Sequence, residues 1–134
     1  MEPWLRYVIA FVVAAHGLTY IPFGLLVPGQ LQGWRGRSWL LGDAVSRDAF
    51  GTLIVALHLL AGVAILLCAG AIAFAPSFPG WWRPLAVLGA VSGLTAFVVF
   101  WDGQPRLVIE EGAIGAVISL ILLVSAVALG GAFN

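Results

Sequence analysis

The sequence contains no lysine, a single cysteine and few charges of either sign. Six arginines balance six acidic residues, and charged residues make up only 9% of the 134 positions. A neutral chain without a basic cluster lacks the electrostatic footprint of a nucleic-acid-binding protein, so no such partner is expected. The lone Cys68 excludes a disulfide framework and a cysteine metal cluster, and the sequence predicts no metal site and no cofactor.

Apolar residues, in contrast, are abundant: 62% of the chain is hydrophobic and the mean hydropathy is +1.08. A soluble domain of this size needs a charged exterior to stay in solution. The sequence therefore predicts an integral membrane protein, located in the inner membrane of the cell and surrounded by membrane lipid. At this length one domain is the default, so a single transmembrane domain over residues 1–134 is expected.

Four apolar runs approach or exceed the roughly 20 residues that a helix needs to cross about 30 Å of hydrocarbon. They cover residues 4–27, 50–75, 84–101 and 107–133, and the longest connection is the loop 28–49. Helices are the expected spanning form, because hydrocarbon leaves an open backbone without hydrogen-bond partners. The predicted fold class is therefore all-α, an antiparallel four-helix transmembrane bundle.

Small residues recur four positions apart inside these runs, at Gly89 and Gly93 and again at Gly115 and Ser119. This spacing lets membrane helices approach one another closely. We interpret it as packing within one chain, and the seam of a homodimer is the alternative.

Most of the charges gather on one side of the predicted bundle. Antiparallel spans place the loop 28–49 and residues 102–111 on the same side, and together these segments hold nine of the twelve charged residues. That side carries four arginines against two on the other side, which favours a cytoplasmic position for it. The remaining charges are Glu2, Arg6 and Arg83.

Both histidines lie inside predicted spans, where an ionisable side chain is expensive and often functional. At 1.5 Å per residue, His16 lies about 17 Å and His58 about 12 Å from the charged side. The two depths differ by about one helical turn, so the sequence predicts that both rings face a cavity opening on that side. Tyr20 follows His16 by one turn on the same helical face. The alternative is that each histidine only packs, hydrogen-bonded to a neighbouring helix.

The stretch "FWDGQPRLVIEEGAIG", residues 100–115, places three carboxylates near the charged side. Asp102 is expected to accept main-chain hydrogen bonds of the turn or to cap the next helix. Glu110 and Glu111 are about 100° apart around a helix, so they do not face one point. They lie either in a solvated first turn or inside the bundle, where an arginine such as Arg106 is the expected partner.

These residues define one candidate site beneath the two loops of the charged side. The acid–base candidates are His16, His58, Asp102, Glu110 and Glu111, and the candidates for ligand contacts are Tyr20, Trp34, Arg35, Arg37, Trp39, Trp101 and Arg106. Aromatic rings in such a site are suited to line a pocket or to stabilise a cation.

Several segments resemble the DoxX-like group of small four-helix membrane proteins. They are Arg6, "AHGL" at residues 15–18 and "LHLLAGVAILLCAG" at residues 57–70. The last looks like the second helix of that group, with His58 in place of the usual glutamate. The resemblance implies a four-helix bundle with both termini on one side, and the group is linked to redox and quinone-associated complexes.

Three functions are compatible with this sequence. The first is a non-catalytic role, as an accessory subunit or as a binder of a lipid-like or quinone-like ligand, with a partner membrane subunit or a homodimer. The second is a small isomerase, cyclase or hydrolase that acts on an apolar substrate through the acid–base candidates. The third is a transporter that works as an oligomer. We favour the first, because the sequence shows no strong catalytic motif and no polar stripe that crosses the membrane.

Overall fold

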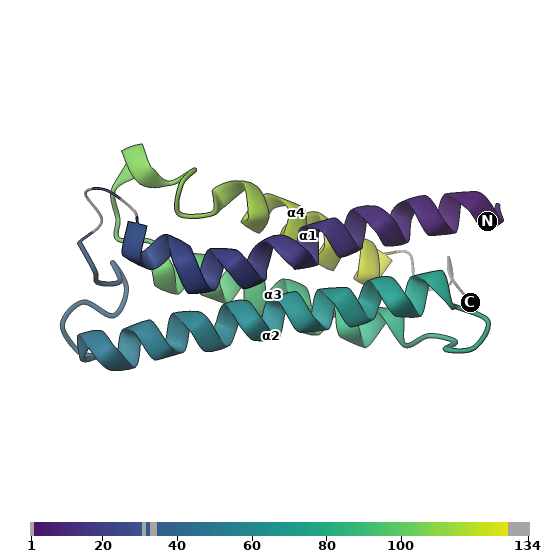
Figure 1. Ribbon diagram of the computed structural model, residues 1–134, viewed down its shortest axis with the longest axis horizontal. Coiled ribbons are helices and arrows are strands. Elements are labelled where there is room, and N and C mark those ends of the chain that lie inside the picture. Colours follow the sequence, from purple (N-terminus) through teal and green to yellow (C-terminus); the bar gives the residue numbers. More distant parts are fainter. Residues whose placement is uncertain (1, 31, 33–34, 129–134) are drawn as a thin grey trace.

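Four α-helices and one 3-10 turn make up the part of the chain that the computed structural model describes, residues 2–30, 32 and 35–128 (Figure 1). The elements are α1 (Pro3–Gln30), α2 (Arg47–Ala73), α3 (Trp82–Phe100), the 3-10 turn η1 (Pro105–Leu107) and α4 (Ala113–Ala128). α1 packs on α2, α2 on α3 and α3 on α4, so helices adjacent in sequence are adjacent in space. The predicted all-α antiparallel bundle is confirmed.

Three of the helices are long and apolar enough to cross a membrane, namely residues Pro3–Leu26 of α1 and the whole of α2 and α3. α4 is also apolar, and its 16 residues correspond to roughly 24 Å of helix. The hydrocarbon core of a bilayer is about 30 Å thick, so α4 is the short helix of the bundle. The chain is a small multi-pass membrane protein.

α4 begins later than the sequence predicts. The apolar run predicts a fourth span from residue 107, but the chain passes through η1 and a series of turns before α4 starts at Ala113. The interruption is completed at Gly112, whose φ of 106° is a backbone conformation that favours glycine. Residues 129–133, the predicted end of this span, lie outside the described part of the chain.

Two glycines of α3 allow the other helices to approach it closely. A Cβ atom on Gly89 would press into the side chain of Ile65 in α2 and lie 3.1 Å from the Ile65 main-chain nitrogen. A Cβ atom on Gly93 would lie 2.8 Å from Cζ of Tyr20 in α1 and 3.1 Å from Oγ of Ser119 in α4. Both glycines therefore pack inside the monomer, as expected from their spacing.

The loop before α2 is tied to the end of α3. The Trp39 main-chain N–H donates to the carbonyl of Trp101 at 3.0 Å, and the Trp39 indole donates to the carbonyl of Val98 at 2.9 Å. The rings of Trp39 and Trp101 also contact each other, with centroids 5.5 Å apart. Figure 1 shows this loop and η1 at the same end of the bundle, which we call the loop end.

Gly89→Ala is expected to lower the free energy of unfolding by about 1–3 kcal/mol, because the added methyl group overpacks the contact between α2 and α3. The matched control is Gly70→Ala in α2, where a Cβ atom would meet nothing within 4 Å. This control should be neutral, or stabilising by up to about 1 kcal/mol through helix propensity. Reversible unfolding in mixed micelles, followed by circular dichroism, measures both, and equal stabilities would contradict the packing described for Gly89.

Candidate functional site

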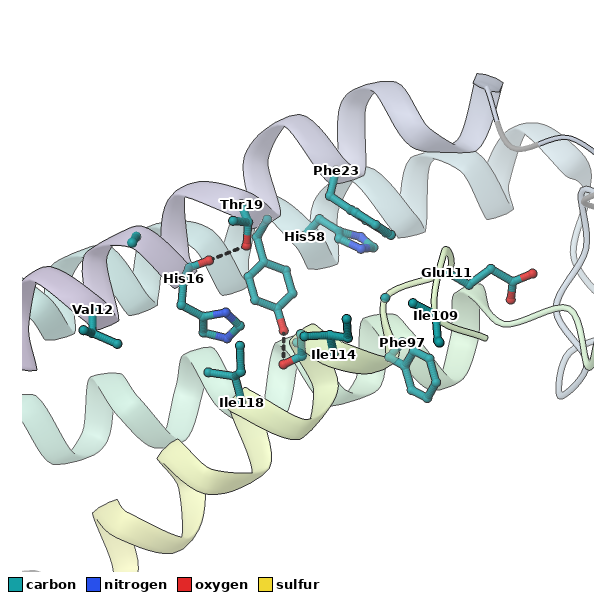
Figure 2. A pocket seen from close by; sticks show the side chains of 15 residues that line it. Val12, His16, Thr19, Phe23, His58, Phe97, Ile109, Glu111, Ile114 and Ile118 are labelled. Atoms are coloured by element: carbon teal, nitrogen blue, oxygen red, sulfur yellow. Dashed lines mark hydrogen bonds between the residues drawn. The ribbon is translucent and has the colours of Figure 1, made fainter. Parts of the chain in front are cut away.

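A cavity of about 460 Å³ lies between α1, α4 and the turn that precedes α4 (Figure 2). It is lined by Val12, Ala15, His16, Thr19, Tyr20, Phe23, His58, Gly93, Phe97, Ile109, Glu111, Gly112, Ile114, Gly115 and Ile118. Most of this surface is apolar. Val12 of α1 and Ile114 of α4 are 58% and 62% exposed at its edge. These two exposed lining residues lie on the first and last helices of the bundle, so the cavity reaches the surface beside both helices.

A polar cluster joins α1 to α4 within this cavity. Nε2 of His16 lies 3.1 Å from Oγ of Ser119, and the hydroxyl of Tyr20 lies 2.7 Å from the same atom. The Tyr20 hydroxyl also donates a long hydrogen bond to the carbonyl of Gly115, at 3.5 Å. One serine on α4 therefore satisfies two polar side chains of α1 that would otherwise face apolar surroundings.

His58 of α2 reaches the same cavity from the opposite wall. Its Nδ1 lies 2.8 Å from the main-chain carbonyl oxygen of Ile54. Its ring stacks on Phe23, with centroids 5.4 Å apart and an angle of 21°, and meets Tyr20 at 5.9 Å. His16, Tyr20 and His58 thus line a common cavity, as the sequence predicts, and its opening on the charged side stays a prediction.

The two glutamates point in different directions. Glu110 is exposed, whereas Glu111 is only 1% exposed and lines the cavity at the loop end. Oε2 of Glu111 accepts a hydrogen bond from the main-chain N–H of Asp102 at 3.0 Å, and Oε1 has no partner among the described residues. Figure 2 shows the Glu111 carboxyl group pointing away from both histidine rings.

Asp102 organises the turn after α3. Its carboxylate accepts the main-chain N–H of Arg35 at 3.1 Å and that of Gln104 at 2.9 Å, and the Gln104 side-chain amide also donates to it. Asp102 thus accepts main-chain hydrogen bonds of the turn, as the sequence predicts, and it also ties the loop before α2 to that turn. The carboxylate is therefore occupied by structural contacts.

The two buried carboxyl groups differ in acidity. Burial raises the pKa of Glu111 to about 7, and the nearby negative charges of Asp102 and Glu110 raise it against the opposing hydrogen bond from the Asp102 main chain. Burial would also raise the pKa of Asp102, but hydrogen bonds from Gln104 and Arg35 outweigh it and the pKa of Asp102 is lowered. The pair therefore consists of a charged Asp102 and a Glu111 that titrates near neutral pH.

The arginines that the sequence analysis expects to form an ion pair with a buried glutamate make other contacts. In the described part of the chain, no arginine lies within salt-bridge distance of Glu111, so that expectation is wrong. Arg106 donates to the Gln104 side-chain oxygen at 3.0 and 3.3 Å, and Arg37 pairs with Asp43 at 3.5 Å. The main-chain N–H of Asp102 contacts Glu111 where an arginine was expected. Because this N–H carries no charge, the negative charge of an ionised Glu111 is not balanced.

The remaining candidates for ligand contacts lie at the loop end and not among the residues that line the cavity. Trp39 and Trp101 contact each other there, and Arg35 contributes its main-chain N–H to Asp102. Trp34 lies outside the described residues. The sequence analysis missed Ser119 as the polar partner of His16 and Tyr20, because its spacing from Gly115 was interpreted only as a packing signal.

The polar side chains of the cavity are held by contacts other than a carboxylate–histidine pair. Among the described residues, no carboxylate hydrogen-bonds to His16 or His58. In the same part of the chain, no three His, Cys, Asp or Glu side chains come together in the way that a metal ion requires. The cavity instead presents a few fixed polar atoms on an apolar surface, which is typical of small-molecule sites.

Fold and site together define a small multi-pass membrane protein with an intramembrane cavity beside its loop end. No protein-family model, curated protein or solved structure matches this chain. Membership of the DoxX-like group therefore stays a prediction based on the residues quoted for it.

Ser119→Ala is expected to lower the free energy of unfolding by about 0.6–2 kcal/mol, because it leaves His16 and Tyr20 without their shared partner. The matched control is Ser125→Ala, also in α4, since Ser125 makes no side-chain hydrogen bond to the described residues. Unfolding in mixed micelles measures both variants. If both variants lower the free energy of unfolding by the same amount, the polar cluster does not stabilise the contact between α4 and α1.

The stability of the wild-type protein should fall as the pH rises from about 4.5 to about 7 through the contribution of Glu111. The raised pKa means that the folded protein retains a proton in this window that the unfolded chain releases. Glu111→Gln should remove this contribution, so its stability relative to wild type should increase with pH across the window. Glu110→Gln is the control, because Glu110 is exposed. Parallel stability curves for wild type and Glu111→Gln would rule out this assignment.

Proposed function

We propose that this protein binds a lipid-like ligand, which it takes from the bilayer into the cavity between α1 and α4. The volume of about 460 Å³ lies within the range of small-molecule sites. Apolar walls with a few fixed polar groups suit a ligand with a long apolar body and a small polar head. All the lining residues belong to one chain, which supports binding by a single copy.

The observation that carries this proposal is the combination of an exposed apolar edge with a buried polar interior. Val12 and Ile114 are exposed at the edge, in the part of the bundle that faces hydrocarbon, while His16 and His58 are buried inside. An exposed apolar edge in a membrane contacts lipid chains, and a ligand dissolved in the bilayer reaches the polar interior along it. An aqueous solute would have to cross this apolar edge first.

The arginine count supports one orientation of the protein in the membrane. With four arginines on the loop-end side against two on the other, we place the loop end in the cytoplasm and the protein in the inner membrane of the cell. The cavity then extends from the cytoplasmic side to about the middle of the bilayer, where His16 lies. A ligand would enter from the lipid leaflet on that side.

Binding is favoured over catalysis by the partners of the polar side chains. An acid–base enzyme would need a carboxyl group within hydrogen-bond reach of a histidine or of the reacting atom. The carboxyl group of Glu111 instead contacts the main chain of Asp102, and His16 contacts Ser119. These contacts hold the side chains in place and leave the cavity for a ligand.

The test is to fill the cavity from within. Gly115→Leu adds a side chain that points toward Tyr20 and His16, whose nearest atoms would lie 3.8 and 3.9 Å from a Cβ atom at this position. Wild-type protein extracted in native lipid nanodiscs should retain an apolar small molecule that mass spectrometry detects above the bulk lipid. The variant should lose it by at least about tenfold, which corresponds to about 1.4 kcal/mol of binding free energy.

Val117→Leu is the matched control, because Val117 is exposed on the same helix and does not line the cavity. This control should retain the ligand at the wild-type level. The proposed function fails if the molecules retained by wild type, Val117→Leu and Gly115→Leu are the same in kind and amount.

A further inference from the structure

The protonation of His58 is defined by its contacts. Nδ1 lies 2.8 Å from the carbonyl oxygen of Ile54, and a carbonyl oxygen only accepts hydrogen bonds, so Nδ1 carries a proton. His58 is 3% exposed, and its ring neighbours are Tyr20, Phe23 and Phe100. A charged imidazole without a carboxylate partner is costly in such surroundings, so the ring is neutral. In the neutral ring Nε2 is therefore a hydrogen-bond acceptor.

This acceptor has no partner in the described protein. His58 lines the cavity, and no described residue hydrogen-bonds to its Nε2 atom. Stacking on Phe23 and edge contact with Phe100 at 6.2 Å hold the plane of the ring. The structure thus contains a pre-oriented acceptor inside an apolar cavity, where a polar atom without a hydrogen bond is unfavourable.

The charge of the cavity narrows the choice of ligand further. No arginine is among its lining residues, and Glu111 is the acidic residue that lines it. A ligand with an anionic head would therefore meet no fixed positive charge in the cavity. A neutral head that donates a hydrogen bond fits both the charge of the cavity and the acceptor on His58.

We propose that the ligand is a neutral membrane-soluble alcohol or phenol whose hydroxyl group donates a hydrogen bond to Nε2 of His58. This inference rests on the proposed function and specifies its ligand class. The hydroxyl group lies deep in the cavity, beside the face of Phe23, and the apolar body extends past Ile114 toward the bilayer. His16 and Tyr20, held by Ser119 behind them, belong to the neighbouring wall.

Three photoreactive probes with the same alkyl chain test this inference. One ends in a primary alcohol, one in the corresponding methyl ether and one in a carboxylate. Each carries a diazirine in the chain and is added to wild-type protein in nanodiscs, and mass spectrometry measures the labelling of peptides from α1 and α4. The alcohol is expected to label these peptides about tenfold more than the ether, since a satisfied buried acceptor is worth about 1.4 kcal/mol or more.

Two substitutions connect the preference to His58. His58→Phe removes the acceptor and keeps an aromatic ring between Phe23 and Phe100, so the alcohol should lose its advantage over the ether. His58→Gln retains a polar atom near the position of Nε2 and should retain most of the preference. If either variant fails to fold, the comparison of alcohol with ether in the wild-type protein is sufficient to test the inference.

The outcomes separate this inference from the function on which it rests. Equal labelling by alcohol and ether, or strongest labelling by the carboxylate, overturns the hydroxyl assignment. If that result is accompanied by loss of labelling in Gly115→Leu, lipid-like binding in the cavity still stands. If no probe labels wild type above the Gly115→Leu background, the proposed function and the inference fail together.

Discussion

Hydrocarbon offers no hydrogen bonds, and the polar contacts of this bundle follow from that constraint. His16 and Tyr20 of α1 find their partner in Ser119 of α4, and His58 finds one in the main chain of its own helix. The contact with Ser119 bridges the two helices that are farthest apart in sequence. The need to satisfy polar side chains therefore also sets where the first and last helices meet.

The same constraint explains how the chain tolerates an irregular segment before α4. Open backbone at the edge of a membrane must be packed against protein. Asp102 and Glu111 meet this need by accepting main-chain N–H groups of the turn and of the loop before α2. The interruption at Gly112 then directs α4 so that Gly115 faces the cavity and Ser119 faces His16 and Tyr20. A continuous helix from residue 107 would present different side chains there.

Composition and the positions of the apolar runs were sufficient to predict the all-α bundle, and helical depth was sufficient to place His16 and His58 at one cavity. The break at Gly112 was not predictable in this way, because the apolar residues before it continue the pattern of a span. The inward direction of Glu111 depends on that break. The role of Ser119 depends on the rotation of α4, and small residues at helical spacing are common in any membrane helix.

Packing in sequence order also has a consequence for how the protein assembles. Each helix makes its main contacts with the one that precedes it, so the bundle can build up while the chain is being synthesised, with short-range contacts forming first. The seam between α1 and α4 is the helix contact of longest sequence separation, so by the same argument we expect it to form last. The lining residues come from both ends of the chain, so the cavity is complete only when α4 has packed on the helices before it.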